Sequence, residues 1–587
     1  MSLAPAIRDA ALRWIADDPD PATRDELQRL LAAALAGGPS ALRSNTQQHG
    51  SHQGGDPALS RMPTQGKAPA EELAERMAGM LRFGTAGLRG PVRAGPAGMN
   101  VAVVRRATAG LASWLTAHGH GGGTVVVGRD ARHGSAEFAV AASEVLAGAG
   151  FRVTALADPL PTPVLAHSVR AVGAVAGVQV TASHNPPADN GYKVYLADGA
   201  QLVEPSDAEI EAAIAAAPAA VSIDTAPVTP TDPAELLERY LATVARLPRG
   251  TARGLRIALT PMHGVGGAVA VHALRLAGFD DVHVVRSQAA PDPDFPTVAF
   301  PNPEEPGATD ALLALAAEVG ADLAVALDPD ADRCALGVPD QTAPGGWRML
   351  TGNETGVLLG DHVLATLDRA VHPDPLVATT VASSTQLRAV AATRNARFAE
   401  TLTGFKWIVR AGGPGADLVF GFEEALGYCV DPAAVRDKDG IAAAVLAADL
   451  AAIRHTAGGS LLDVLDELAL AHGVYLTAAV TILMTPEERA AAVAKLAGAE
   501  IARLVGAGTE LERPAPDVVV LRGERTRAVI RPSGTEPKLK AYLEVVEPPP
   551  DAPAGLPEAR IRAKQRLDAL RTQINALLTA PTEPEAN

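Results

Sequence analysis

After Glu71 the chain alternates between short apolar runs of strand length and Ala/Leu-rich stretches of helical length. TVVVG at 124–128 and AVAGVQV at 174–180 are typical of the short runs. Strands that alternate with helices favour parallel or mixed sheets covered by helices, so the pattern predicts α/β layers. The chain has 587 residues, which is enough for about three to five domains with substantial cores.

Changes in composition divide the chain into four predicted units. The first is residues 1–231, with an insertion at about 37–70 that is rich in Gly, Gln, Ser and Pro and that we predict to be mobile because it lacks apolar periodicity. The second and third units, 232–345 and 346–470, continue the α/β pattern. The last, 471–587, combines runs typical of an antiparallel sheet with a closing helix, which predicts an α+β domain.

Three similar runs hint at an internal repeat. ADLAVAL at 321–327 and ADLVFGF at 416–422 are both apolar strands followed by an acidic loop, and AVAGVQV at 174–180 is a candidate third copy. The similarity is weak, so the sequence leaves repetition open.

The overall charge and the cysteine content exclude several classes of protein. Lys plus Arg total 51 against 67 for Asp plus Glu, a net charge of −16, and the basic residues are scattered, so nucleic-acid binding is not expected. Two cysteines, Cys334 and Cys429, are too few for a disulfide framework and fit a reducing cytoplasm. No signal peptide or charge-free apolar run of about 18 residues indicates a membrane segment. We expect a cytoplasmic protein, monomeric or a small homo-oligomer, with a small-molecule partner.

The stretch TASHNPPADNGYKVY at 181–195 follows a buried-looking strand. Open α/β sheets bind ligands at the carboxyl ends of their strands, so this loop is a candidate site. Ser183 is a plausible nucleophile, but its hydroxyl needs a base or a metal, and His184, Asn185 and Lys193 are candidates for help. The alternative is a turn in which Ser and Asn bind local backbone groups.

Acidic residues recur at every second position in ALDPDADRCAL: Asp328, Asp330 and Asp332. In an extended loop this spacing directs the three carboxylates to one side. Three hard oxygen ligands suit Mg²⁺ or Mn²⁺, whereas the alternative is a solvated acidic turn. Arg333 could neutralise a carboxylate or reach a phosphate.

A third stretch, RPSGTEPKLKAY at 531–542, has the composition of a phosphate-binding turn. Gly534 permits a tight bend, so that backbone N–H groups and the hydroxyls of Ser533 and Thr535 can face one anion. Arg531 adds a charge-assisted donor fork. A plain β-turn between strands is the alternative.

Carboxylates and cations also follow the strand in FGFEEALGY. Glu423 and Glu424 lie there, and Arg436 and Lys438 come soon after in VRDKDG, a set that could bind the hydroxyls of a sugar. Charged helix ends would explain the same residues.

Two further stretches are rich in arginine. RFGTAGLRG at 82–90 and GRDARHGS at 128–135 could either bind anions or be surface loops with paired charges.

Together, and in this order, the four main stretches resemble the α-D-phosphohexomutase superfamily, which includes phosphoglucomutases and phosphomannomutases. TASHNP is similar to its phosphoserine loop, DPDADR to its metal loop, GFEEALG to its sugar-binding loop and RPSGTEPKLKAY to its phosphate-binding loop. The resemblance implies three related α/β domains with mixed sheets, followed by an α+β domain, around a central active-site cleft.

The resemblance also implies roles for individual residues. Ser183 would carry a phosphate and, with Asp328, Asp330 and Asp332, hold one Mg²⁺, while a sugar bisphosphate acts as activator. Catalytic roles would fall to Ser183, Lys193 as candidate base, Arg89 and His184. Substrate contacts would come from Arg333, Glu423, Lys438, Arg531, Ser533, Gly534 and Thr535.

The expected activity is therefore a phosphosugar mutase that interconverts 1- and 6-phosphates of glucose or mannose through phospho-Ser183 and a bisphosphate. Ala425 replaces the serine of the EES sequence found in many phosphoglucomutases, and this change, with TLTGFKW at 401–407, is similar to phosphopentomutase-like and glucose 1,6-bisphosphate-synthesising relatives. A phosphatase of the haloacid dehalogenase type, with Asp328 and Asp330 as nucleophile and acid, is a rival that leaves TASHN without a role. A sugar-phosphate-binding protein without turnover is a third alternative.

Overall fold

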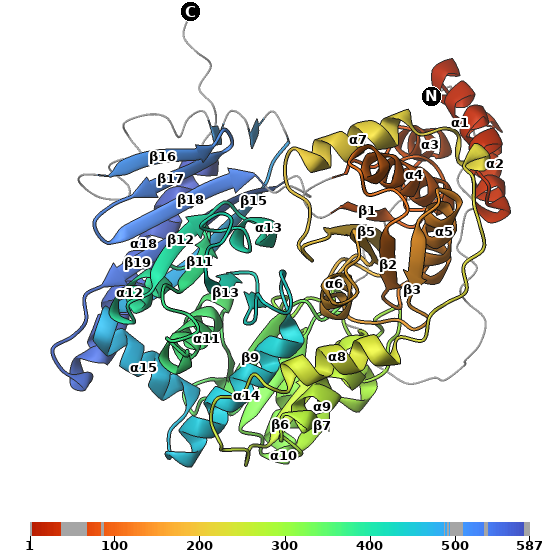
Figure 1. The fold of residues 1–587 in the computed structure, drawn as a ribbon. Coiled ribbons are helices and arrows are strands. Elements are labelled where there is room, and N and C mark those ends of the chain that lie inside the picture. The colour runs from red at the N-terminus through yellow and green to blue at the C-terminus, as the bar shows by residue number, and fades with distance from the viewer. Residues whose placement is uncertain are drawn as a thin grey trace, which may run out of the picture.

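The computed structural model describes residues 3–36, 67–83, 87–485, 488–489, 492–493, 509–532 and 538–579. Most of the predicted insertion, 37–66, lies outside the described residues, as do Ser533, Gly534 and Thr535. Figure 1 shows four units that follow one another around the molecule in chain order, each built on its own sheet.

The first unit has a five-stranded sheet in the order β1-β5-β4-β2-β3. Both faces are buried, because Val126 of β2 packs into one hydrophobic cluster while its neighbours Val125 and Val127 pack into another. The N-terminal helices pack on this unit from outside (Figure 1). Its elements are α1 (Pro5–Asp17), α2 (Pro21–Ala36), α3 (Pro69–Arg76), β1 (Leu88–Pro91), α4 (Val101–Ala117), β2 (Thr124–Arg129), α5 (Ser135–Gly148), β3 (Arg152–Ala155), α6 (Thr162–Ala171), β4 (Ala176–Val180), β5 (Asp189–Leu196) and α7 (Ser206–Ala216).

The second and third units have the sheet orders β10-β9-β8-β6-β7 and β12-β11-β13-β14. The second contains α8 (Ala234–Val244), β6 (Ile257–Thr260), α9 (Gly266–Leu276), β7 (Val282–Val284), α10 (Asp310–Val319), β8 (Leu323–Leu327), β9 (Cys334–Pro339) and β10 (Trp347–Met349). The third contains α11 (Gly352–Thr366), β11 (Leu376–Thr380), α12 (Gln386–Thr393), β12 (Arg397–Thr401), α13 (Phe405–Ile408), β13 (Leu418–Glu423), β14 (Gly427–Cys429), α14 (Gly440–Thr456) and α15 (Leu461–His472).

These three units repeat one topology. Each has three parallel strands, β3-β2-β4, β7-β6-β8 and β12-β11-β13, and the last strand of each set then pairs with an antiparallel strand, β5, β9 or β14. The three similar runs of the sequence form β4, β8 and β13, which occupy equivalent positions. The repeat that the sequence left open is therefore real, and the loops after these strands are equivalent.

The fourth unit is an antiparallel sheet in the order β15-β19-β18-β17-β16, with one long helix against it. Leu570 and Ile574 of the helix share a hydrophobic cluster with Leu543 of the sheet. The predicted α+β domain is confirmed. Its elements are β15 (Val474–Leu483), β16 (Glu510–Ala515), β17 (Val518–Arg522), β18 (Thr526–Pro532), β19 (Lys538–Glu547) and α18 (Leu556–Thr579).

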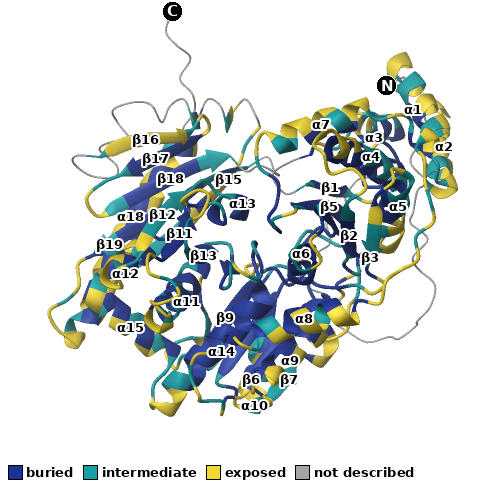
Figure 2. Cartoon of the chain, viewed as in Figure 1, coloured by how far each residue is buried: buried dark blue, intermediate teal, exposed yellow. Residues whose placement is uncertain are grey.

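One continuous hydrophobic cluster joins the first three units, and Figure 2 shows buried residues in each of them. It includes Leu165 of α6, Val325 of β8 and Phe420 of β13, together with most of α14, which is buried over nearly its whole length. A shared core of this kind fixes the relative positions of the three loops, because a packed interior transmits displacements instead of absorbing them.

Within the described part of the chain, no single helix is long and apolar enough to cross a membrane. The pair α14 and α15 reaches the required length and composition only when joined across an 89° bend.

Candidate active site

Ser183 lies in the loop between β4 and β5 and is held in an uncommon backbone conformation. Its φ of 53° is left-handed, which costs a non-glycine residue free energy unless surrounding contacts enforce it. The Ser183 amide donates to Thr181 Oγ1 at 2.9 Å. The hydroxyl is buried and donates to Asp328 Oδ2 at 2.8 Å, so this loop and the loop after β8 meet at the serine.

The three aspartates after β8 form one buried cluster. An oxygen of each lies within 4.8 Å of the others, which is close enough to hold one metal ion. The turn is fixed by the Arg333 amide, which donates to Asp328 Oδ1 at 3.0 Å, and by Thr162 of α6, whose hydroxyl donates to Asp330 Oδ2 at 2.5 Å. Oδ1 of Asp330 and Oδ1 of Asp332 are buried without a hydrogen-bond partner among the described residues. Unpartnered buried carboxylate oxygens fit an oxygen-binding cation.

Two lysines from different units reach the aspartates. Lys193 Nζ, on β5, lies 2.6 Å from Asp330 Oδ2 and 2.7 Å from Asp332 Oδ2, and Lys438 Nζ lies 3.3 Å from Asp332 Oδ2. Burial favours the neutral form of Lys193, but the two carboxylates outweigh it and hold the pKa of Lys193 above its usual value. Burial and repulsion by the other aspartates raise the pKa of Asp328 well above its usual range.

His184 and Arg89 border the serine. His184 Nδ1 lies 3.3 Å from Ser183 Oγ, and burial, with the nearby arginines, lowers the pKa of His184 well below its usual value, so the imidazole is neutral. Arg89, on β1, donates to Asn185 Oδ1 at 3.4 Å, and its Nε is buried without a partner among the described residues. The serine thus has a neutral imidazole beside its hydroxyl, and an arginine contacts its loop through Asn185.

The loop after β13 faces the metal loop. The Cys334 amide donates to the Leu426 carbonyl at 3.1 Å, so the second and third units are hydrogen-bonded here. Burial raises the pKa of Glu423 to about 7, against the opposing effects of Lys438 and Arg333. Glu424 accepts hydrogen bonds from Thr380 and Ser383, both at 3.1 Å, and is therefore fixed in orientation.

A cavity of about 450 Å³ adjoins this loop, at the junction of the second, third and fourth units. Its volume lies in the range of small-molecule sites, roughly 300–1,000 Å³. Ala425 lines it, so the missing serine hydroxyl falls on a cavity wall. Its polar lining includes Glu304, Thr351, Asn353, Glu424, Thr477, Lys540 and Tyr542.

The fourth unit brings Arg531 and Lys540 to neighbouring positions, as cross-strand partners on β18 and β19. Arg531 is half-buried. Lys540 and Tyr542 belong to the stretch RPSGTEPKLKAY, but the sequence predicts no role for either of them. Glu304 is not identified from the sequence at all. Glu304 lies in a polar loop before α10, and no local pattern marks it.

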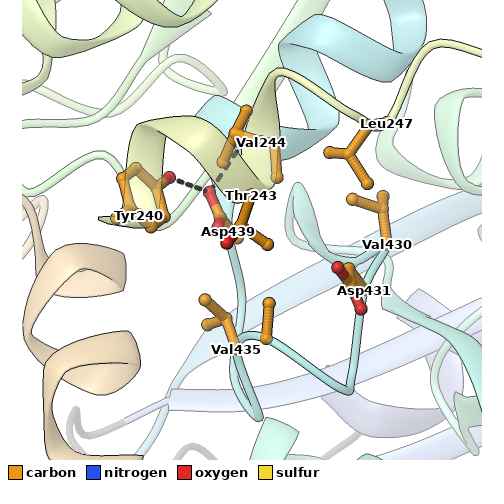
Figure 3. A pocket seen from close by; sticks show the side chains of 10 residues that line it. Tyr240, Thr243, Val244, Leu247, Val430, Asp431, Val435 and Asp439 are labelled. Atoms are coloured by element: carbon orange, nitrogen blue, oxygen red, sulfur yellow. Dashed lines mark hydrogen bonds between the residues drawn. The ribbon is translucent and has the colours of Figure 1, made fainter. Parts of the chain in front are cut away.

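The segment that carries Lys438 is anchored on both sides. Asp437 accepts hydrogen bonds from the Tyr195 hydroxyl at 2.8 Å and from Gln201 Nε2 at 2.6 Å, which joins the first and third units. Asp439 caps α14 through the Ala442 amide at 2.8 Å and accepts the Tyr240 hydroxyl at 2.8 Å (Figure 3). The cavity beside Asp439 measures only about 10 Å³ and is too small for a sugar phosphate.

The repeated sheets thus converge on one serine, one carboxylate cluster and several cations, an arrangement suited to carrying a phosphoryl group. On fold and site together, the protein is a phosphosugar mutase, an enzyme of the phosphotransferase kind. Its sequence matches all four models of the phosphoglucomutase/phosphomannomutase family: alpha/beta/alpha domain I at residues 80–220, domain II at 238–341, domain III at 351–470 and the C-terminal domain at 481–551. The chain belongs to this family, as the sequence motifs predicted.

Curated relatives carry several substrate names. A probable phosphomannomutase of Haemophilus influenzae is 40% identical, over 76% of this chain and 93% of its own length. A phosphopentomutase of Mus musculus is 33% identical, over 82% and 86% respectively, and a phosphoglucomutase of Staphylococcus epidermidis is 32% identical, over 81% and 92%. A solved structure from Thermus thermophilus, provisionally assigned as a phosphomannomutase, superposes with a TM-score of 0.64 at 26% identity, covering 83% of this chain and 99% of that one.

Proposed function

We propose that the protein interconverts the 1- and 6-phosphates of glucose or mannose, with Ser183 as the phosphate carrier. The observation that carries this proposal is the 2.8 Å contact of Ser183 Oγ with Asp328, at the edge of a three-aspartate cluster that two lysines also reach. A phosphate on Ser183 adds about −1.5 to −2 charges, which surrounding cations must offset.

Asp328, Asp330 and Asp332, together with the oxygen on Ser183, would hold one divalent cation. An all-oxygen donor set with two unpartnered carboxylate oxygens favours Mg²⁺. When bound, such an ion supplies charge stabilisation to a phosphoryl group in transfer.

The protein's own groups would position and neutralise the reactants. Phospho-Ser183 would give its phosphoryl group to the free hydroxyl of the sugar monophosphate, so that the P–Oγ bond breaks as the new P–O bond forms. The bisphosphate would then turn around and return its other phosphate to Ser183. Arg89 would stabilise charge on the transferred phosphate, and neutral His184 could donate or accept a hydrogen bond beside Oγ.

Lys193 is our candidate for the base that accepts the proton of the attacking hydroxyl. Its ammonium is stabilised by Asp330 and Asp332, so it must lose part of that stabilisation before it can act as a base. Lys193 would pass that proton to Ser183 Oγ as this oxygen leaves, and in the second transfer the proton of the Ser183 hydroxyl would pass back to the departing sugar oxygen.

The sugar phosphate would bind between the third and fourth units. Glu423 and Lys438 would contact its hydroxyls, while Arg333 and Arg531, with Ser533, Gly534 and Thr535, would hold the phosphate that is not being transferred. The partner that we propose is a free sugar phosphate. We further propose that the enzyme works in the cytoplasm as a monomer or small homo-oligomer, with a sugar bisphosphate as activator.

Ser183→Ala tests the mutase against the rival phosphatase mechanism. Mutase activity of the variant should fall to background, because no carrier oxygen remains. Phosphatase activity that survives in Ser183→Ala at the wild-type rate would favour Asp328 as nucleophile instead.

The preferred sugar needs its own test, since relatives of this chain are named for mannose, glucose and pentose phosphates. We expect kcat/KM for glucose or mannose 1-phosphate to exceed that for ribose 1-phosphate. A clear preference for ribose 1-phosphate would identify a phosphopentomutase, and net production of glucose 1,6-bisphosphate would identify a synthase; Ala425 on the cavity wall is the feature that favours these alternatives.

A further inference from the structure

Arg132, in the turn between β2 and α5, places its whole guanidinium against the loop that carries Ser183. Nη2 donates to the carbonyls of Ser183 and Asn185, at 2.5 and 2.7 Å. Nη1 donates to the carbonyls of Pro186 and Asp189, at 2.9 and 3.2 Å. One side chain therefore binds four backbone carbonyls across the loop.

The loop has a particular need for such a donor. Residues 186 and 187 are both proline and offer no N–H, so the segment cannot form a regular hydrogen-bond ladder. The Ser183 carbonyl is buried and those of Asn185, Pro186 and Asp189 are partly buried, so they need hydrogen-bond donors, which Arg132 supplies. Ser183 within this loop has a left-handed conformation, which persists only where surrounding contacts enforce it.

Arg132 is itself fixed from two sides. Asp130 accepts from the Arg132 amide at 2.9 Å and lies 3.3 Å from Arg132 Nε. The guanidinium carbon lies 4.9 Å from the centre of the Phe295 ring, which belongs to the second unit. Only 4% of Arg132 is exposed, so the guanidinium is shielded from solvent.

We propose that Arg132 is a positioning residue: it fixes the backbone of the Ser183 loop so that Oγ is directed at the aspartate cluster. The proposal rests on the proposed function, in which Ser183 accepts and returns a phosphate. Arg132 would not touch the substrate. Its loss should slow phosphoryl transfer to Ser183 while leaving sugar-phosphate binding intact.

The test measures how fast Ser183 becomes phosphorylated. Dephosphorylated wild type and Arg132→Lys are mixed with glucose 1,6-bisphosphate and Mg²⁺, and the mass of the Ser183 peptide is followed in time. A lysine keeps the positive charge but cannot span four carbonyls. We expect the rate constant to fall about 100-fold, as for other small misplacements of reacting groups, with the final extent of phosphorylation and KM unchanged.

The final extent of Ser183 phosphorylation distinguishes a positioning defect from misfolding. In a partly unfolded variant a smaller fraction of the protein would become phosphorylated, but the rate constant of the folded fraction would not change. Arg129→Lys is the matched control: Arg129 is the last residue of β2, just before the turn that holds Arg132, and among the described residues it donates to the carbonyls of Asp130 and Ala157, at 3.3 and 3.4 Å. It should behave as wild type. If Arg132→Lys does not fold, Asp130→Asn gives a second test, because it weakens the ion pair with the Arg132 guanidinium. We expect a smaller drop in the phosphorylation rate constant of this variant.

Wild-type rate constants in Arg132→Lys, or in Asp130→Asn where Arg132→Lys does not fold, would overturn this proposal alone. A wild-type enzyme that takes no phosphate on Ser183 would instead overturn the proposed function on which it rests.

Discussion

A single buried carboxyl group beside the candidate site can make the stability of the protein depend on pH. Asp439 is an example, because it caps α14 directly after Lys438 and is 3% exposed. Burial raises the pKa of Asp439 to about 7, in spite of its hydrogen bonds from Ala442 and Tyr240. The folded protein therefore holds a proton on Asp439 at a pH where the unfolded chain has lost it.

Asp439→Asn should remove this pH dependence. The pKa of Asp439 is higher in the folded protein than in the unfolded chain. Its contribution to stability is therefore complete below the pKa of the unfolded chain, near 3.8, and is lost as the pH rises towards 7. The loss is at most about 1.4 kcal/mol for each pH unit in that window. Asparagine can accept the same two hydrogen bonds, so the Tm of the variant relative to wild type should be higher at pH 7.5 than at pH 5. A difference in Tm that does not change with pH would contradict the assignment.

Among the secondary-structure elements, three hairpins carry the proposed site residues: β4–β5 carries Ser183, β8–β9 the aspartates and β13–β14 Glu423. These elements were predictable, since each is an apolar run followed by polar, Gly- or Pro-containing residues. Contacts between units were not predictable. Asp437 meets Tyr195, and Arg132 meets Phe295, across long stretches of sequence, and no local pattern records such pairs.

The aspartate spacing predicted a cluster, but the lysines that neutralise it could not be assigned to it. Lys193 follows Ser183 by ten positions, yet its contacts are with the loop after β8. Alternation along β5 gives the face of the sheet on which a side chain lies, whereas its partner depends on how two units dock. The sequence suggested Lys193 as a base, and its ion pairs became visible only in the structure.

The fourth unit is attached to the third through Glu544 of β19. Glu544 accepts from the amide and hydroxyl of Thr385, at 2.8 and 2.7 Å, and lies 3.5 Å from Arg527 Nε. Glu544→Ala should destabilise the protein by about 2–4 kcal/mol, because it removes hydrogen bonds to a charged group and leaves partners unsatisfied. The change in the midpoint of urea unfolding measures this.

Glu524→Ala serves as the control for that variant, because the Glu524 side chain is 85% exposed and its ion pair with Arg525 spans 3.7 Å. It should shift stability by less than about 0.5 kcal/mol. Equal midpoints for Glu544→Ala and Glu524→Ala would show that Glu544 does not attach the two units.

At the scale of the whole molecule, three units share one core, and their loops meet at a cluster of buried like charges. Burying like charges away from water costs free energy unless a cation neutralises them. The folded state should therefore bind Mg²⁺ more tightly than the unfolded chain does. Mg²⁺ at 100 times its Kd should stabilise the enzyme by about 2.7 kcal/mol. Thermal unfolding with and without EDTA tests this, and Asp330→Asn should lose most of the shift; an equal Tm in Mg²⁺ and EDTA would count against a metal at the cluster.

We propose above all that Ser183 carries the phosphate that reaches the sugar. The most direct test is a chase: enzyme labelled with ³²P on Ser183 is mixed with unlabelled glucose 1-phosphate and Mg²⁺ and quenched at short times. We predict that label leaves Ser183 and appears in sugar phosphate at a rate no slower than turnover. Label that stays on Ser183 while product accumulates would contradict the account.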